Sequence, residues 1–227
     1  MLGIISSVAD LRKEPKFQSE RESQLLYGEE VIIIEKLEEY SEIVGPDGLK
    51  GFIKNTQIGE IDNRKYKLRA HFSGHNFTLS FGSYLDEKDL EKFRIPKRLV
   101  CNIDRSFEPA KLSHSFLGVP YLWGGTSDFG FDCSGFTQRL FRFSNIEIPR
   151  NSEWQKDSAQ TVSEFAGAEE GDLIFFKGHV AIYLGNGNII HANGHYMAVA
   201  YTNLFDKSEY SKSLMNIFIK IGRFKKQ

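Results

Sequence analysis

Cys133 is the residue of this 227-residue sequence that is best placed to act as a nucleophile. It begins a predicted helix, CSGFTQRLFRFS, directly after Asp132, which takes the expected N-cap position. An unperturbed thiol has a pKa of about 8.5, and the unpaired amides of a helix N-terminus and a nearby imidazolium both favour the thiolate. The alternative is a small buried hydrophobic residue, which is what we expect of Cys101 inside the apolar run RLVCNI.

A nucleophilic cysteine needs a base, and the candidates are His179 and His191, in the predicted strands HVAIYL and NIIHA. A two-residue turn at Asn186 and Gly187 would place position 182 opposite 191 and turn the two rings to opposite sides of the sheet. A three-residue loop over 185–187, with Gly187 left-handed, places 181 opposite 191 and both rings on one face, about 7–8 Å apart. We predict this loop, so that one imidazole orients the other.

Other roles for these three side chains remain open. Either histidine alone fits a structural role, and cysteine and histidine are also zinc ligands. The sequence has no CxxC or HxxxH cluster, so we predict no metal and no cofactor. The other histidines have no partner pattern and are expected to be exposed: His71, His75, His114 and His195.

The elements around these residues predict an α+β fold. Residues 1–60 alternate short apolar runs with turn signals and indicate a small antiparallel β-barrel. Residues 61–105 continue as β structure, either a second barrel or a packed connector, and contain the charged segment DEKDLEKF, which suits one or two helical turns. Residues 106–227 form the third part, in which helices starting at Pro109 and after Asp132 precede an antiparallel meander. Its predicted strands are DLIFF, HVAIYL, NIIHA, YMAVAYT and SLMNIFIKIG.

The composition narrows the function classes. With 29 Lys and Arg against 30 Asp and Glu, the net charge is −1, which argues against nucleic acid and anionic membranes as partners. Two isolated cysteines fit a reducing compartment. We find no leader-like segment and no stretch of 18 apolar residues, so we expect a soluble cytoplasmic protein. Its oligomeric state is left open.

An ordered set of motifs resembles the NlpC/p60 family of papain-like cell-wall peptidases. These motifs are VPYLWGGTSDFGFDCSGF, IPRNSEWQ and EEGDLIFFKGHVAIYLGNGNIIHA, and the likeness covers about residues 106–224. The segments SERESQLLYGEEV and PDGLKGFI resemble the bacterial SH3-like domains that often precede this catalytic domain. The resemblance implies a cytoplasmic γ-D-glutamyl-L-diamino-acid endopeptidase that acts on peptidoglycan-derived peptides.

The resemblance also implies roles for individual residues. Cys133 matches the nucleophile, His179 the general base and His191 the polar group that orients the base. Tyr121 matches the residue whose hydroxyl, with the Cys133 amide, stabilises the tetrahedral oxyanion. The positions that match the lining of the substrate groove are Asp132, Ser134, Arg150, Asn151 and Ser152, of which the two serines are candidates to hold the D-glutamate α-carboxylate.

The sequence departs from family members that require a free N-terminal L-alanine. Those members usually have an acidic residue after the PR pair and a tyrosine in the SH3-like turn, where this chain has Asn151 and Leu49. A buried ammonium without an ion-pair partner costs several kcal/mol. We expect either an amine-binding acid elsewhere or an acyl group without a free amine; the candidate acids are Glu22, Glu29, Glu30 and Asp47.

Two other function classes fit the same motifs. A papain-like core also serves amidases and acyltransferases, which share the acyl-enzyme step. A non-catalytic module that binds cell-wall peptides is the third class, although the presence of all three polar positions argues against it.

Overall fold

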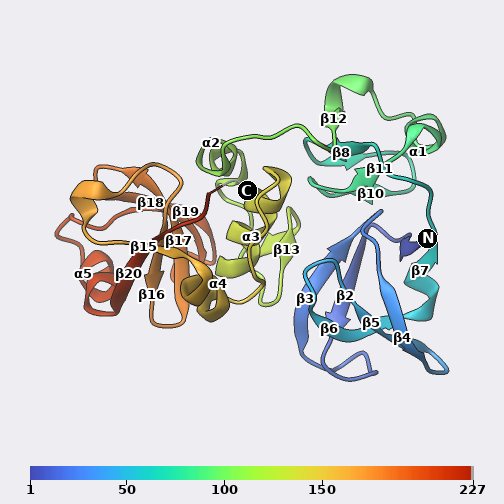
Figure 1. The fold of residues 1–227 in the computed structure, drawn as a ribbon, viewed down its shortest axis with the longest axis horizontal. Coiled ribbons are helices and arrows are strands. Elements are labelled where there is room, and N and C mark those ends of the chain that lie inside the picture. The colour runs from blue at the N-terminus through green and yellow to red at the C-terminus, as the bar shows by residue number, and fades with distance from the viewer. Residues whose placement is uncertain (226–227) are drawn as a thin grey trace. The chain divides into compact units, whose positions relative to one another are not determined.

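The computed structural model describes residues 1–225 and divides into two compact units. The first unit comprises Met1–Arg105 and Trp123–Phe129; the second comprises Ser106–Leu122 and the chain from Gly130 onward. Figure 1 shows the strands within residues 1–105 of the first unit in blue to green and those within residues 160–223 of the second in orange to red. The α+β fold class is confirmed.

The N-terminal part of the first unit is an antiparallel β structure, as predicted. Five strands pair in the order β3-β2-β6-β5-β4, and β1 pairs with β7. Alternating side chains point inward and form one apolar core that includes Leu11, Ile43 and Ile53, all fully buried. The elements are β1 (Leu2–Ile4), β2 (Val8–Arg12), β3 (Arg21–Leu26), β4 (Ile32–Lys36), β5 (Tyr40–Val44), β6 (Lys50–Lys54), the 3₁₀ turn η1 (Asn55–Gln57) and β7 (Ile58–Glu60).

Residues 61–105 have a small core of their own. A three-stranded sheet, β11-β8-β12, lies with the hairpin β9-β10 around a core that includes Leu68 and Leu85. The charged segment forms the helix α1 (Glu87–Lys92), as expected, because Asp86 and Asp89 form a reciprocal capping box at its start. The other elements are β8 (Tyr66–Leu68), β9 (Phe72–Ser73), β10 (Thr78–Leu79), β11 (Tyr84–Leu85), η2 (Lys97–Leu99) and β12 (Val100–Asn102).

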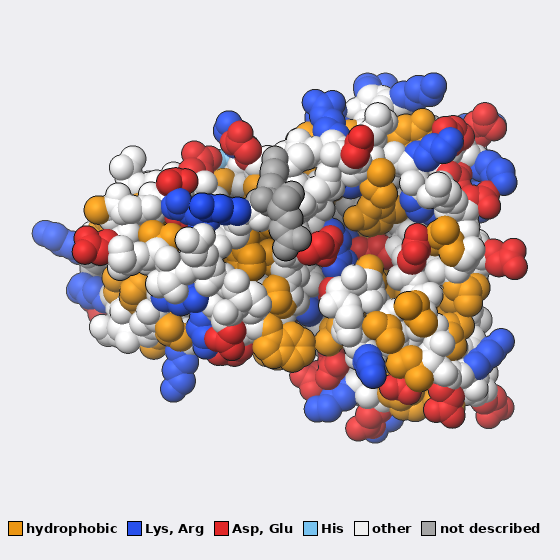
Figure 2. Space-filling model, viewed as in Figure 1, with side chains coloured by type: hydrophobic (Ala, Val, Ile, Leu, Met, Phe, Trp, Pro, Cys, Tyr) orange, Lys and Arg blue, Asp and Glu red, His pale blue; other side chains and the backbone are white. Residues whose placement is uncertain are grey.

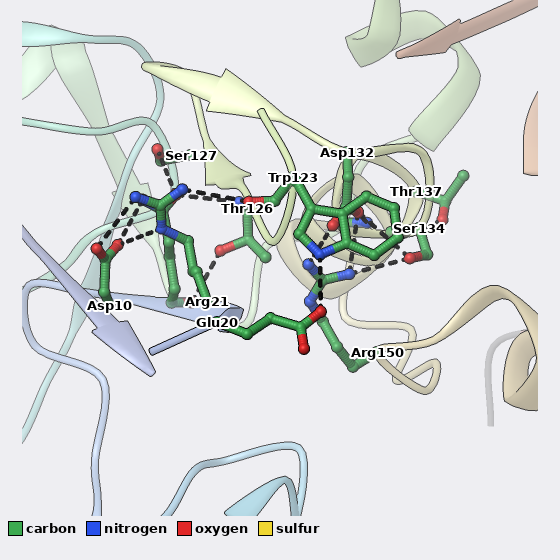
Figure 3. A network of polar contacts seen from close by, with 12 residues as sticks. Asp10, Glu20, Arg21, Trp123, Thr126, Ser127, Asp132, Ser134, Thr137 and Arg150 are labelled. Carbon is green, nitrogen blue, oxygen red and sulfur yellow. Dashed lines mark hydrogen bonds and ion pairs between the residues drawn. The ribbon is translucent and has the colours of Figure 1, made fainter. Parts of the chain in front are cut away.

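The segment Trp123–Phe129 belongs to the first unit although its sequence neighbours belong to the second. It contains β13 (Thr126–Ser127). The Oγ1 atom of Thr126 donates to the Gln24 carbonyl at 2.8 Å, and the Arg21 guanidinium donates to the Trp123 carbonyl at 3.2 Å. Asp10 holds the same guanidinium, as Figure 3 shows. These bonds anchor the segment to β3.

The second unit is built on a six-stranded antiparallel sheet, β15-β20-β16-β17-β18-β19. The helix α3 packs against β17 and β18. Its elements are α2 (Pro109–Ser113), η3 (His114–Phe116), β14 (Gly130–Phe131), α3 (Cys133–Phe143), α4 (Ser152–Ser158), β15 (Gln160–Val162), η4 (Phe165–Gly167), β16 (Leu173–Phe176), β17 (His179–Gly185), β18 (Asn188–Asn193), β19 (Ala198–Asn203), α5 (Glu209–Asn216) and β20 (Phe218–Arg223).

One predicted strand of the meander is wrong over its first half. SLMNIFIKIG was expected to be strand throughout, but 213–216 end the helix α5 and only 218–222 lie in β20. The Ser208 hydroxyl accepts from the Ser211 amide and caps α5 before the apolar run begins. Leu214 is buried in the domain core from this helix. The cap therefore lies outside the segment whose apolar character suggested a strand.

The β17-β18 hairpin combines the two loops considered from the sequence. Its turn is two-residue, because Gly185 pairs with Asn188 and Asn186 and Gly187 have φ of 52° and 77°. The predicted three-residue loop is therefore wrong. However, a β-bulge between Tyr183 and Gly185 adds one residue, so 182 pairs with 190 and the predicted register, 181 opposite 191, is confirmed.

Charge is distributed without a dominant sign over the face in view in Figure 2, where Lys and Arg side chains alternate with Asp and Glu. This pattern agrees with the net charge of −1. Among residues 1–225, no helix has both the length and the apolar character needed to cross a membrane.

Candidate active site

Cys133 is the first residue of α3, where the sequence predicted it. The Asp132 side chain caps the helix by accepting a hydrogen bond of 2.6 Å from the Gly135 amide. The cap fixes the backbone of the helix start and therefore the direction of the Cys133 side chain. Cys133 is partly exposed, whereas Cys101 is buried in the first unit, as expected.

Burial dominates the electrostatics of the thiol. It raises the pKa of Cys133 to about 11, and the adjacent Asp132 carboxylate acts in the same direction. The backbone amides of Val180 and Ser134 hydrogen-bond to the sulfur and oppose this shift in pKa. The neutral thiol is therefore favoured, opposite to the sequence expectation of a helix-stabilised thiolate, because desolvation outweighs the amides.

His179 and His191 form a direct hydrogen-bonded pair. The Nε2 atom of His179 lies 2.7 Å from the Nδ1 atom of His191, and the ring of His179 stacks on Phe176. Because Val180 follows His179 and its amide contacts the Cys133 sulfur, the start of β17 brings the histidine pair close to Cys133. The sequence prediction that the two rings share a face and that one orients the other agrees with this geometry.

Both imidazoles are held neutral. Burial lowers the pKa of His179 to about 4. The pKa of His191, which is 0% exposed, is lowered well below its usual value by burial first and by His179 and His195 next. Neutral imidazole has an unprotonated ring nitrogen and is the form that can accept a proton.

Tyr121 lies in the chain before α3. The Tyr121 amide donates to the Met197 carbonyl at 2.9 Å, and Tyr121 forms a parallel bridge with Phe131, two residues before Cys133. Burial, followed by the charges at Cys133 and Asp132, raises the pKa of Tyr121 to about 12. The phenol therefore keeps its proton and can donate a hydrogen bond to a developing oxyanion.

Arg150 joins the loop before α4 to the start of α3. Its guanidinium binds both oxygens of Asp132, at 2.6 and 3.0 Å, and donates to the Ser134 hydroxyl at 2.9 Å (Figure 3). The Ser134 hydroxyl in turn donates to Asp132 at 3.3 Å. All three residues are buried. Their contacts fix the start of α3, while their role in lining the substrate groove stays a prediction.

The two remaining groove candidates lie at the start of α4. Asn151 is its N-cap residue, is exposed and makes no side-chain cap, and Ser152 is half-buried. In the first unit, two of the four candidate acids have local hydrogen bonds: Glu29 accepts from the Leu26 amide and Asp47 from the Leu49 amide. Glu29 is 2% exposed, so its carboxylate serves the turn that it closes.

Three site residues were not recognised in the sequence. The Val180 amide bonds to the sulfur, the Thr202 hydroxyl lies 3.0 Å from the Nε2 atom of His191, and the Gln155 amide donates to the Ser134 carbonyl at 3.0 Å. Gln155 lies inside the motif IPRNSEWQ, which offered a signal. The Val180 backbone amide and Thr202, which lies in an alternating strand, have no such signal in the sequence.

The part of the chain that the structure describes contains no candidate metal site. Within residues 1–225, no three or more His, Cys, Asp or Glu side chains are grouped so that they could hold a metal ion.

Two segments of the chain match known protein families. Residues 118–218 match the NlpC/P60 family, and residues 11–58 match the bacterial dipeptidyl-peptidase SH3 domain.

Curated relatives match over part of their length. A γ-D-glutamyl-L-lysine dipeptidyl-peptidase of Bacillus cereus is 49% identical over 85 residues, which cover 34% of this chain and 25% of the relative. The bifunctional muramidase/DL-endopeptidase CwlT of Bacillus subtilis is 32% identical over 180 residues, covering 70% of this chain and 51% of CwlT. The matched regions thus span between a quarter and a half of these relatives.

The fold has a solved counterpart. A crystal structure of an NlpC/P60 family protein from Bacillus cereus superposes with a TM-score of 0.80 at 21% identity, over 98% of this chain and 99% of that one. At this identity the likeness concerns the fold alone. The matched segments identify the chain as an NlpC/P60 family domain preceded by a bacterial dipeptidyl-peptidase SH3 domain.

Proposed function

We propose that the chain is a cysteine peptidase that hydrolyses the γ-D-glutamyl-L-diamino acid isopeptide bond of peptidoglycan-derived peptides. The observation that carries the proposal is the pair of neutral histidines, 2.7 Å apart, reached through the strand whose Val180 amide contacts the Cys133 sulfur. A nucleophile, a base and a group that orients the base are the parts needed for covalent acyl transfer. The name of the Bacillus cereus relative, γ-D-glutamyl-L-lysine dipeptidyl-peptidase, supports the choice of bond.

Acylation begins with a proton transfer. His191 occupies the Nε2 atom of His179, so the Nδ1 atom is the one that takes the proton of the Cys133 thiol. Because the neutral thiol is favoured, this transfer accompanies the attack of sulfur on the γ-carbonyl of D-glutamate. The Tyr121 hydroxyl and the Cys133 amide stabilise the oxyanion that forms.

Collapse of the tetrahedral intermediate completes the first half of the reaction. The carbon–nitrogen bond breaks, and the imidazolium of His179 gives its proton to the leaving amine of the diamino acid. Water then attacks the thioester while His179 takes its proton. The carbon–sulfur bond breaks, His179 returns this proton to the sulfur, and the D-glutamyl carboxylate and the free thiol are released. No redox change or external cofactor enters these steps.

Mass spectrometry of defined peptides tests this proposal. Incubation with L-Ala-γ-D-Glu-L-Lys and with its diaminopimelate analogue is expected to yield L-Ala-D-Glu and the free diamino acid. The α-linked isomer of the same peptide is the matched control and is expected to remain intact. Cleavage of the Ala–Glu bond, or equal cleavage of the α-linked control, contradicts the proposed bond specificity.

The requirement at the peptide N-terminus is a separate question, raised by Asn151 and Leu49. We propose that this enzyme either binds the amine through another acid or accepts an acyl group that has no free amine. Comparing the free with the N-acetylated tripeptide tests this, together with single substitutions of Glu22, Glu29, Glu30 and Asp47 by the corresponding amide. A strong preference for the free amine that none of the acids affects, Glu29 included, contradicts both branches.

A further inference from the structure

The hydrogen-bond chain from the histidine pair does not stop at His191. The Nε2 atom of His191 lies 3.0 Å from the Oγ1 atom of Thr202. Thr202 lies on β19, where its neighbour Ala200 is the cross-strand partner of His191. Residues 200 and 202 share a face of the strand, so Thr202 is a diagonal neighbour of the imidazole.

Thr202 is the partner of that nitrogen in the described part of the chain. His191 is 0% and Thr202 7% exposed. Two further titratable side chains lie near this ring: Tyr210 stacks on His191, and His195 stacks on Tyr210. Across residues 1–225, neither of them hydrogen-bonds to a ring nitrogen of His191.

The proton transfers of the proposed reaction require a particular protonation state of His191. When His179 holds the thiol proton, both of its nitrogens carry hydrogen, and its Nε2–H donates to the Nδ1 atom of His191. His191 must then carry its own hydrogen on Nε2. Because that N–H is buried, it needs an acceptor, and leaving it unpaired would cost the free energy of a lost buried hydrogen bond.

We propose that Thr202 is a positioning residue whose hydroxyl, able to donate or accept, accepts from the Nε2–H of His191 and so stabilises the tautomers of both histidines that the reaction needs. In the resting protein, His191 then carries hydrogen on Nε2 and His179 carries hydrogen on Nε2. The Nδ1 atom of His179 is left unprotonated for the Cys133 thiol. In the opposite arrangement, with hydrogen on Nδ1 of both rings, the lone pair of His179 is on Nε2, where it accepts from His191, and none is left on Nδ1 for the thiol proton. This inference rests on the proposed function, because it assigns the tautomers that the proposed reaction needs.

Replacing the hydroxyl by a methyl group removes the acceptor at nearly constant volume. The T202V variant is expected to lose about tenfold to a hundredfold in kcat, the range that corresponds to an unpaired buried polar group, with little change in KM. T202S keeps the hydroxyl and is expected to retain most of the activity. T161V, in the exposed strand β15, is the matched control and is expected to behave as the wild type.

Nitrogen-15 NMR of the imidazoles gives a readout that does not depend on turnover. With ¹⁵N-histidine-labelled protein at neutral pH, the wild type and T202S are expected to show protonated Nε2 and unprotonated Nδ1 on both rings. T202V is expected to shift His191 toward the Nδ1-protonated form, because an unpaired nitrogen lone pair is less costly than an unpaired N–H. Thermal unfolding of each variant shows whether it is folded.

The two measurements separate the possible failures. Hydrogen on Nδ1 of both rings in the wild type overturns the tautomer assignment, whatever the activity. Equal loss in T202V and T202S, or wild-type kcat and tautomers in T202V, also overturns it. If the wild type has the predicted tautomers but cleaves none of the γ-linked peptides, the proposed function fails while the tautomer assignment stands.

Discussion

The imidazoles of His179 and His191 are joined by a hydrogen bond of 2.7 Å, although a hairpin separates them by twelve positions in the chain. The bulge between Tyr183 and Gly185 makes this possible, because it shifts the strand register by one residue after a regular two-residue turn. A hairpin without the bulge turns the two rings to opposite faces. The geometry of the histidine pair therefore depends on a bulge that contributes neither ring.

Gly187 should be the most sensitive residue of this turn. It has φ of 77°, and a Cβ atom there would lie 2.4 Å from the Phe205 ring. Gly185 has φ of 90° but open space around it, so G185A is the matched control. We expect G185A to cost about 1–2 kcal/mol of unfolding free energy from backbone strain, and G187A at least about 1 kcal/mol more from overpacking. Urea unfolding checks this, and equal losses would show that Phe205 yields freely.

The buried histidines should make the stability depend on pH. Burial lowers the pKa of His179 from 6.5 to about 4, so between these values the unfolded chain holds a proton that the folded protein lacks. Stability is thus present above pH 6.5 and is lost as the pH falls toward 4, by up to about 1.4 kcal/mol per pH unit for one ring.

Unfolding in urea at pH 7, 6 and 5 measures this slope. H179N should reduce this slope by the amount that corresponds to about one bound proton. H75N, which removes an exposed histidine, should leave the slope unchanged. An H179N slope equal to that of the wild type would mean that His179 takes up its proton as readily in the folded protein as in the unfolded chain.

Arg150 should contribute mainly to stability. Its side chain is 2% exposed, and its loss leaves the Asp132 carboxylate buried without its ion pair. We expect R150M to cost about 3–5 kcal/mol. The control K111M breaks an exposed pair with Glu108 and should change stability by less than about 0.5 kcal/mol. Chemical denaturation distinguishes the two, and an R150M protein as stable as K111M would show that the buried pair adds nothing.

The oxyanion role predicted for Tyr121 can be isolated by removing one oxygen atom. Y121F keeps the ring packing, so we expect a loss of about a hundredfold in kcat with little change in KM. Y201F, at an exposed tyrosine that hydrogen-bonds to His114, is the control and should retain full activity. Steady-state kinetics on the γ-linked tripeptide provides the comparison. A wild-type kcat in Y121F would show that backbone amides stabilise the oxyanion without the Tyr121 hydroxyl.

The sequence predicted the parts of the site that local patterns encode. The cap at Asp132 fixes the start of α3 and hence Cys133, and alternation in β17 and β18 fixes the faces of the two histidines. It failed where residues just outside the pattern decide the local structure. The bulge at 184 replaced the expected loop, and the Ser208 cap turned an apolar strand pattern into the helix α5.

Other features of the site arise only from tertiary packing. The neutral thiol follows from burial that a local helix argument cannot measure. The position of Thr202 depends on the register between β18 and β19. The separation of Trp123–Phe129 from Tyr121 between two units has no signature in the continuous YLWGGTSDF segment. Such features depend on which surfaces meet, and one-dimensional patterns do not contain that information.

Turnover by the C133A variant tests the central claim most directly. With the γ-linked tripeptide and mass-spectrometric detection, C133A should release no diamino acid while its thermal unfolding matches the wild type, and C101A should cleave normally. Continued release by folded C133A at a rate near that of the wild type would contradict a mechanism in which this sulfur forms the acyl-enzyme.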